Sequence, residues 1–252
     1  MVWGETPSEH ATRHTCEIAT IYFSNSEPCV HRVFYFIREK GNGTMSILNL
    51  SDLENHPTRT KQHEISISLL ANYYETYLHP NYYDFKLNNG VTIRIDFHKE
   101  HFCHLVGIDQ ISTAKFKNPN DTRLFMYRGK NGFRRSKNGK YEFNHLRALH
   151  QHEFNKQKDK MFFFHFIHTM LDSVNLTLVN YTIISGSTIR CDFMFYDTYD
   201  NALLHLGVEK DRKTGYFFPK TFFVRYLTNT QADKYVKPQT VVGITQLTKV
   251  PR

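Results

Sequence analysis

Apolar residues return at helical spacing over residues 64–78, EISISLLANYYETYL. The residues that share one face of such a helix are Ile67, Leu70, Tyr74, Tyr77 and Leu78. Pro80 follows two residues later, and the residue before a proline disfavours the helical backbone. The pattern therefore predicts a helix that ends before Pro80.

Two alternating apolar stretches flank a glycine turn in the next segment. YYDFKL (82–87) and VTIRIDF (91–97) alternate apolar and polar residues, and NNG (88–90) separates them. An Asn-Gly turn between two such stretches is a strong local signal for a β-hairpin. The sequence predicts an antiparallel hairpin over residues 82–97.

The period changes again in HKEHFCHLVGI, residues 98–108. Phe102, Leu105 and Val106 would share one helical face, and Gly107 stands where a glycine ends a helix. We expect a short helix here, directly after the hairpin.

The second half of the chain changes from helical to β-type patterns. The stretch 117–143 is basic and contains two glycine turns, which predicts a loop or a pair of short elements. Residues 143–175 contain no glycine or proline and carry apolar residues at helical spacing, which predicts one long helix or two consecutive ones. Candidate strands follow at 177–184, 188–197, 202–211, 214–226 and 240–249. Helices followed by neighbouring strands indicate an α+β fold, with an N-terminal helical part packed on a C-terminal antiparallel β-sheet.

Residues 1–44 form a separate part in this interpretation. Two apolar stretches, at 16–23 and 29–37, precede the turn-rich REKGNGT at 38–44. We expect residues 1–44 to be an N-terminal extension, either an appendage or a small hairpin, and residues 45–252 to be a single α+β domain.

The net charge of the chain indicates a class of binding partner. Lys and Arg outnumber Asp and Glu by 32 to 24, which gives a formal net charge of +8. A positive surface attracts polyanions, because the release of counterions favours the complex. We therefore expect a polyanionic partner, with RNA as the first choice.

The cysteines and the chain's apolar runs indicate a compartment. Cys16, Cys29, Cys103 and Cys191 are scattered without a CxxC pair, so neither a disulfide framework nor a cysteine zinc site is expected. No basic start with an apolar run marks a secretory signal, and no run approaches the ~18 apolar residues that span a bilayer. We expect a soluble cytoplasmic protein with no membrane partner.

Two sequence segments, or phrases, are more specific than the general fold class. HFCHLVGI (101–108) follows a hairpin strand, and LLHLGVEKDRKTGYFFPKTFF (203–223) joins a strand, a turn and an aromatic-Pro-x-Thr-Phe segment. With these phrases the chain resembles the phage-associated branch of the barnase, EndoU, colicin and RelE-like nuclease superfamily, in which Thr221 takes the place of a small hydroxyl residue. The resemblance implies a nuclease-like domain at 45–252 that cleaves RNA without metal or other cofactor. It also implies a toxin or phage-defence effector, and leaves open an antitoxin or immunity protein as partner.

Attack by a ribose 2′-hydroxyl needs a base, an acid and groups that stabilise the phosphorane. His104 is the candidate for proton transfer, because an imidazole with a pKa of about 6.5 titrates near neutral pH. Thr221 and Tyr216 complete the predicted catalytic set, with hydroxyl groups that can donate to phosphate or, for Tyr216, a ring that can stack on a base. The alternatives remain structural: His104 in a turn contact, Thr221 filling a strand position and Tyr216 in the core.

Cations supply the predicted substrate-binding set. They are Arg134 and Arg135 in the basic stretch, Arg147 and Lys160 on the predicted long helix, and Lys220 and Arg225 on the aromatic strand. Strict alternation puts Lys220 and Arg225 on opposite faces and Tyr216 on the face of Lys220. Arg225 suits a phosphate clamp because its guanidinium binds two oxygens at once.

Three hypotheses remain open at this point. The first is a metal-independent endoribonuclease that binds RNA through the basic loop at 123–140. The second is a non-catalytic protein that binds nucleic acid or an acidic protein. The third is a metal-dependent nuclease built on His98, His101 and His104, which lacks an accompanying carboxylate pattern or HExxH motif. The absence of GxGxxG, Walker and GxSxG motifs argues against nucleotide-dependent enzymes and serine hydrolases.

Overall fold

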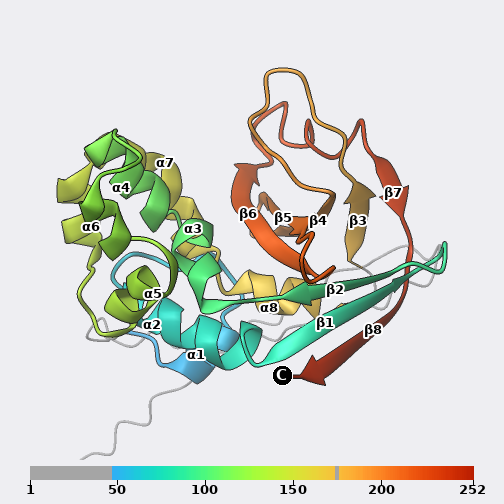
Figure 1. Ribbon diagram of the computed structural model, residues 1–252, viewed down its shortest axis with the longest axis horizontal. Helices are drawn as coiled ribbons and strands as arrows, with labels where there is room; N and C mark the ends of the chain where they lie inside the picture. The colour runs from blue at the N-terminus through green and yellow to red at the C-terminus, as the bar shows by residue number, and fades with distance from the viewer. Residues whose placement is uncertain (1–46, 174–175) are drawn as a thin grey trace, which may run out of the picture. The chain divides into compact units, whose positions relative to one another are not determined.

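A computed structural model of the protein describes residues 47–173 and 176–252 (Figure 1). The described residues fall within one compact unit, Gly43–Arg252. The extension predicted for residues 1–44 lies outside them, so its form and the domain boundary stay predictions.

The helix predicted for residues 64–78 is confirmed. It begins as α2 (Ile67–Tyr73), where the Ser66 side chain caps the first turn by accepting a hydrogen bond from the Leu69 N–H at 3.0 Å. It continues as one π-helical turn, η1 (Tyr74–Leu78), and ends before Pro80.

The predicted hairpin is also present. Strands β1 (Asn81–Leu87) and β2 (Thr92–Asp96) pair antiparallel. Gly90 sits in the turn with a φ of +83°, a conformation that glycine adopts without steric cost.

The short helix after the hairpin is confirmed in two pieces, η2 (Lys99–His101) and α3 (Phe102–Leu105). Gly107 ends it with a φ of +88°, as expected for a left-handed helix terminus. A side chain at this position would also collide with Gln157, whose Cβ would lie 2.6 Å from the added Cβ. Gly107 therefore permits both the turn and the close approach of another helix.

The basic stretch 117–143 forms a pair of short elements, one of the two predicted alternatives, whereas the predicted long helix is divided into three. The elements are α4 (Ile108–Phe116), η3 (Thr122–Met126), α5 (Gly129–Lys137), α6 (Phe143–Leu149), α7 (Gln151–Phe162) and α8 (Phe166–Leu171), while α1 (Leu50–Glu54) precedes α2. The break between α6 and α7 falls at His150, which is extended and caps α7 by accepting from the Glu153 N–H. His150 thus divides a stretch that has no glycine or proline, and a second break follows α7 at residues 163–165.

Among the described residues, eight strands form one sheet in the order β7-β3-β4-β5-β6-β2-β1-β8 (Figure 1). The later strands are β3 (Thr177–Asn180), β4 (Phe193–Tyr199), β5 (Ala202–Lys210), β6 (Phe217–Tyr226), β7 (Thr240–Val242) and β8 (Ile244–Pro251). The fold contains both helices and a sheet, as predicted, but the sheet is mixed because β2 and β6 pair parallel through Ile95 and Phe217. The predicted order of helices before strands was wrong, since β1 and β2 precede most helices and lie inside the same sheet.

The main core joins the helices to one face of this sheet. Helices α3 and α7 contact β6, and α8 contacts β4. Tyr74, Phe102, Phe164 and Phe222 are fully buried there in edge-to-face and stacked ring contacts, and each buried aromatic stabilises the fold by about 1.5–3 kcal/mol. In the described part of the chain, no helix combines the length and apolar character needed to cross a membrane.

Candidate active site

Three histidines follow one another at intervals of three residues where β2 leads into the helices. His98 precedes η2, His101 ends η2, and His104 lies on α3. The ring centroids of His98 and His101 are 5.7 Å apart, and the charge of His104 acts on His101. The hairpin strand and the two short helices therefore set these imidazoles in a row, which we call the histidine row.

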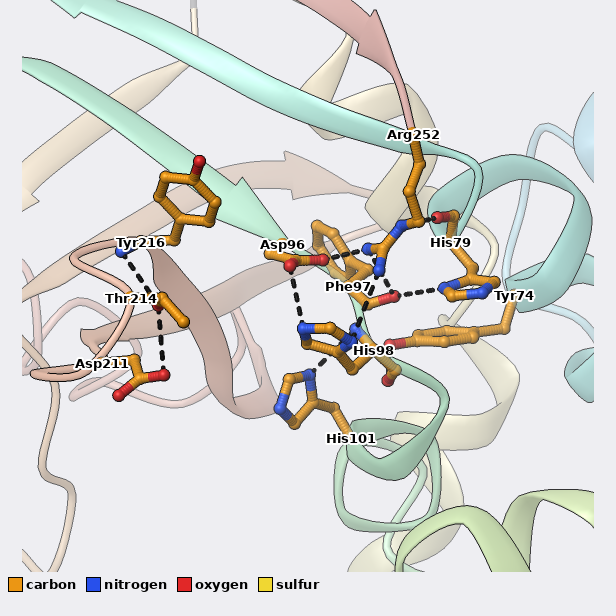
Figure 2. Close-up of polar contacts among 10 residues, drawn as sticks. All are labelled: Tyr74, His79, Asp96, Phe97, His98, His101, Asp211, Thr214, Tyr216 and Arg252. Carbon is orange, nitrogen blue, oxygen red and sulfur yellow. Dashed lines mark hydrogen bonds and ion pairs between the residues drawn. The ribbon is translucent and has the colours of Figure 1, made fainter.

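His98 is held at both ring nitrogens (Figure 2). Its Nε2 lies 2.8 Å from Asp96 Oδ2 and its Nδ1 lies 3.4 Å from Arg252 Nη1. Arg252 also donates to Asp96 and to the carbonyl of His79. With both nitrogens occupied, His98 is a structural link between the hairpin and β8.

His101 has a fixed tautomer. Its Nδ1 accepts the backbone N–H of His98 at 3.2 Å, so the neutral ring carries its proton on Nε2. Burial, together with the charges of His98 and His104, lowers the pKa of His101 to about 4. The ring stacks on Phe218 of β6 at a centroid distance of 5.3 Å. His101 is therefore neutral at physiological pH and acts as a hydrogen-bond donor more readily than as a base.

A pocket of about 340 Å³ opens beside these two histidines. It is lined by Asp96, His98, Glu100, His101, Asp211, Thr214, Tyr216, Phe217 and Phe218. Figure 2 shows the β5–β6 turn facing the histidines, where Thr214 Oγ1 donates to Asp211 at 3.1 Å and accepts from the Tyr216 N–H. Since three carboxylates and no lysine or arginine line it, this pocket disfavours a phosphate group.

His104 is oriented by an acid that is itself held in place. Its Nδ1 lies 3.3 Å from Asp109 Oδ2, and the second oxygen of Asp109 accepts from Arg128 Nε. Although burial opposes ionisation, hydrogen bonds from His104 and Arg128 lower the pKa of Asp109 below its ordinary value. Arg128 also donates to Thr113 Oγ1 at 2.7 Å. With an ionised carboxylate at Nδ1, the proton-accepting nitrogen is Nε2, which lies 3.5 Å from the side-chain amide of Gln110.

Lys160 on α7 is within electrostatic reach of Asp109. Burial lowers its pKa to about 8, while the charges of Glu153 and Asp109 partly offset that shift. It forms no hydrogen bond or ion pair with another described residue. Asp109 is thus an electrostatic neighbour of both His104 and Lys160.

A β-bulge interrupts β6 at Lys220. Across from it, Gly207 pairs with Thr221 and Val208 pairs with Pro219, so Lys220 is left without a partner residue in the ladder. Beyond the bulge, the side chains that would have pointed to one face of the sheet point to the other. The prediction that Lys220 and Arg225 lie on opposite faces assumed an uninterrupted strand. The alternation assumed between Lys220 and Arg225 is therefore broken. The bulge does not fall between Tyr216 and Lys220, so their shared face stays a prediction. Lys220 pairs with Glu209 at 2.7 Å and lies 5.6 Å from the Phe218 ring centre.

The predicted site residues are only partly brought together. Tyr216 shares the pocket with His101, and Lys220 lies above the Phe218 ring on which His101 stacks. The Thr221 methyl group lies against Gly207, near Cys191. Arg225 lies in a separate depression formed by residues 224–229 and donates to the Gln231 carbonyl at 3.2 Å.

The predicted cations on the helices have local partners. Arg147 donates to Gln62 Oε1 at 2.7 Å and lies over the Phe154 ring. Arg135 donates to the Tyr141 hydroxyl at 3.0 Å. Arg134 is exposed on α5 and bonds to Asn131. The catalytic and binding roles of all these residues stay predictions.

Sequence reasoning missed Asp96, Asp109, Arg128 and Arg252. Asp109 follows His104 by five residues, a spacing that could have suggested the pair once a turn at Gly107 was predicted. Arg128 and Arg252 reach their carboxylates from other parts of the chain, and no local pattern marks them.

The histidine row was also weighed as a metal site. Within residues 47–173 and 176–252, no group of three or more His, Cys, Asp or Glu side chains is arranged to hold a metal ion. His98 and His104 instead face separate carboxylates, Asp96 and Asp109.

Comparison with known protein families identifies a match over most of the chain. The model of a family described as phage-Barnase-EndoU-ColicinE5/D-RelE like nuclease4 matches residues 66–250. No curated protein and no solved structure was found to match the chain. The matched range includes the histidine row, Asp109, Arg128 and all of β6.

Proposed function

Since the chain belongs to this phage-Barnase-EndoU-ColicinE5/D-RelE-like nuclease family, we propose that it is a metal-independent endoribonuclease. In this proposal RNA is cleaved by attack of a ribose 2′-hydroxyl, and the protein acts in the cytoplasm as a toxin or phage-defence effector. An antitoxin or immunity protein is a partner that such an effector would need. Family membership supports nuclease activity in general, and the geometry around His104 supports the more specific chemistry.

The observation that carries the proposal is the His104–Asp109–Arg128 arrangement. Among the three histidines of the row, His98 is occupied at both nitrogens and His101 is neutral beside an acidic pocket. His104 differs from the other two histidines of the row because its Nδ1 faces the ionised carboxylate of Asp109, with the cations Arg128 and Lys160 nearby. His104 is thus best suited to take the proton from the 2′-hydroxyl through Nε2.

The neighbouring groups fit the remaining steps. Lys160 and Lys220 are cations that can stabilise the negative charge of the phosphorane. The phenol of Tyr216 and the Nε2–H of His101 can donate hydrogen bonds to the substrate from the pocket. Arg134 and Arg135 would hold the RNA backbone on α5. The Thr221 hydroxyl, predicted as catalytic, would supply at most a minor hydrogen bond to the phosphate.

The test is cleavage of single-stranded and structured RNA by the purified full chain in EDTA. We expect cleavage to persist in the chelator, to yield 2′,3′-cyclic phosphate ends, and to stop when the nucleotide at the cut carries a 2′-deoxy sugar. Loss of cleavage on chelation would favour a metal-dependent nuclease, and RNA retention without cleavage would favour a non-catalytic binding protein.

His104→Ala is the residue-level test. We expect kcat/KM to fall about 10²- to 10⁴-fold, the usual contribution of a positioned acid or base, with RNA affinity unchanged. His63→Ala is the matched control, because His63 is 43% exposed and lies beside Glu64, whereas His104 is 42% exposed beside Asp109. Equal cleavage activity of His104→Ala and His63→Ala would show that His104 takes no part in the mechanism.

A further inference from the structure

The positive charge of the chain is concentrated in one segment. Residues 115–140 contain nine Lys or Arg and one Asp, which gives +8, the formal net charge of the whole chain. The rest of the chain holds 23 residues of each sign and is balanced. Any attraction for a polyanion that follows from net charge therefore originates here.

Most of these cations are available to a ligand. Arg123, Arg128 and Lys137 pair with Asp121, Asp109 and Glu75. Five others are exposed and form no ion pair with a described residue: Lys115, Lys117, Lys130, Arg134 and Lys140. These five can meet phosphates without first breaking an internal ion pair.

One aromatic ring in this segment is open to solvent. Phe125 on η3 is 69% exposed, more than any other large hydrophobic residue in the described part of the chain. Its neighbour Leu124 is buried and anchors η3 to the domain. The ring of Phe125 contacts no aromatic ring or cation among the described residues, whereas Phe116 is covered by Arg123, with the guanidinium carbon 4.4 Å from the ring centre.

The segment is tied to the proposed catalytic pair. Arg128, three residues after Phe125, binds the carboxylate that orients His104. Lys117, at the end of α4, has a φ of +55°, which is uncommon for a residue with a side chain. Such strain is found most often at functional sites.

We propose that Phe125 stacks on an unpaired nucleobase of a single-stranded RNA whose phosphates lie on the exposed cations of residues 115–140. Cations that follow the backbone and an aromatic ring that takes one base are the two components of single-strand binding surfaces. A base inside a duplex is already stacked on both faces and gains nothing from Phe125. This inference rests on the proposed RNA substrate and adds that the substrate is unpaired next to the cut.

The test measures binding of a labelled, unstructured RNA and of a matched duplex to the full chain, both carrying 2′-O-methyl sugars so that the proposed attack by a 2′-hydroxyl cannot cut them. Phe125→Ala should weaken single-strand binding about 5- to 100-fold, the range for loss of one stacked base, and should leave duplex binding and the salt slope unchanged. Lys117→Ala should instead reduce the slope of log affinity against log salt by about 0.7, the value for one single-strand phosphate contact. Ile183→Ala, at a residue 51% exposed outside the segment, should change neither.

A tryptophan probe reports the stacking directly. In a Trp3→Phe background, which removes the chain's one tryptophan, Phe125→Trp fluorescence should be quenched by single-stranded RNA and not by duplex. If Phe125→Ala behaves like Ile183→Ala, or weakens both RNAs equally, the stacking inference is wrong although RNA binding stands. If the unaltered chain binds neither RNA, the inference and the proposed RNA substrate fail together.

Discussion

The two halves of strand β6 differ in what their aromatic residues do. In the first half, residues 217–220, Phe218 lies under His101 and beside the Lys220 side chain. In the second half, residues 221–226, Phe222 is fully buried in the main core and Phe223 stacks on His205 at 4.3 Å. The bulge at Lys220 separates the halves, so one aromatic run contributes both to the candidate site and to the core.

The largest expected difference between the halves is in stability. Phe222→Ala should lower the free energy of unfolding by about 3–5 kcal/mol, because it leaves a cavity in the core. Phe218→Ala should cost clearly less stability but should reduce cleavage, because His101 loses its stacking partner. Urea unfolding and RNA cleavage of both variants test this, and an equal loss of stability would show that Phe218 is also a core residue.

The second half should also respond to acid. Burial lowers the pKa of His205 to about 3, below the unfolded value of about 6.5. Between these values the unfolded chain binds the additional proton, so the stability contributed by neutral His205 is complete above pH 6.5 and is lost as the pH falls toward 3. The slope attributable to this group is about 1.4 kcal/mol per pH unit.

His205→Phe removes that titration and keeps a ring against Phe223. Thermal unfolding at pH 7 and pH 5 should show a smaller acid-induced drop in Tm for the variant than for the unaltered chain. Parallel curves for the two proteins would mean that His205 does not remain neutral as the pH falls.

A smaller difference is expected between the two cations of β6. Lys220→Ala should lower kcat/KM about tenfold, equivalent to one charge contact of about 1.4 kcal/mol, because Lys220 lies next to the histidine row. Arg225→Ala should stay within about twofold in cleavage, because Arg225 lies in the other depression with Gln231. A larger loss of kcat/KM in Arg225→Ala than in Lys220→Ala would indicate that the substrate binds beside the second half of β6.

The smallest effect is expected at Thr221. Its methyl group packs against Gly207, so Thr221→Val, which keeps the methyl and removes the hydroxyl, should change cleavage by less than about twofold. Thr221→Ser keeps the hydroxyl and serves as the control. A tenfold loss in the valine variant alone would assign the hydroxyl to the catalytic site.

The sequence predicts the elements whose signals are local. The hairpin at 82–97 follows from its Asn-Gly turn, and the helix end at Gly107 follows from the conformation that only glycine adopts without cost. His104 could be selected because it lies in the phrase HFCHLVGI and because an imidazole can both accept and donate a proton. Its orienting acid could have been found from the same turn.

The remaining features depend on contacts between distant parts of the chain. The bulge at Lys220 follows Pro219, a residue that an inner strand tolerates mainly at a bulge, but its effect on the faces appears only in the pairing with Gly207 and Val208. The parallel contact of Ile95 with Phe217 joins strands separated by six α-helices. Patterns within single segments carry no information on such pairings, so the arrangement of the sheet and of Arg252 around Asp96 could not be predicted.

The order of strands constrains how this domain folds. Strand β1 is flanked by β2, its neighbour along the chain, and by β8, which follows all the other strands. During synthesis the hairpin therefore emerges with two open edges. The edge of β2 is covered when β6 follows, and the edge of β1 stays unpaired until β8 follows. Contacts between such distant segments slow folding, so we expect nascent or truncated chains that lack β8 to associate through β1.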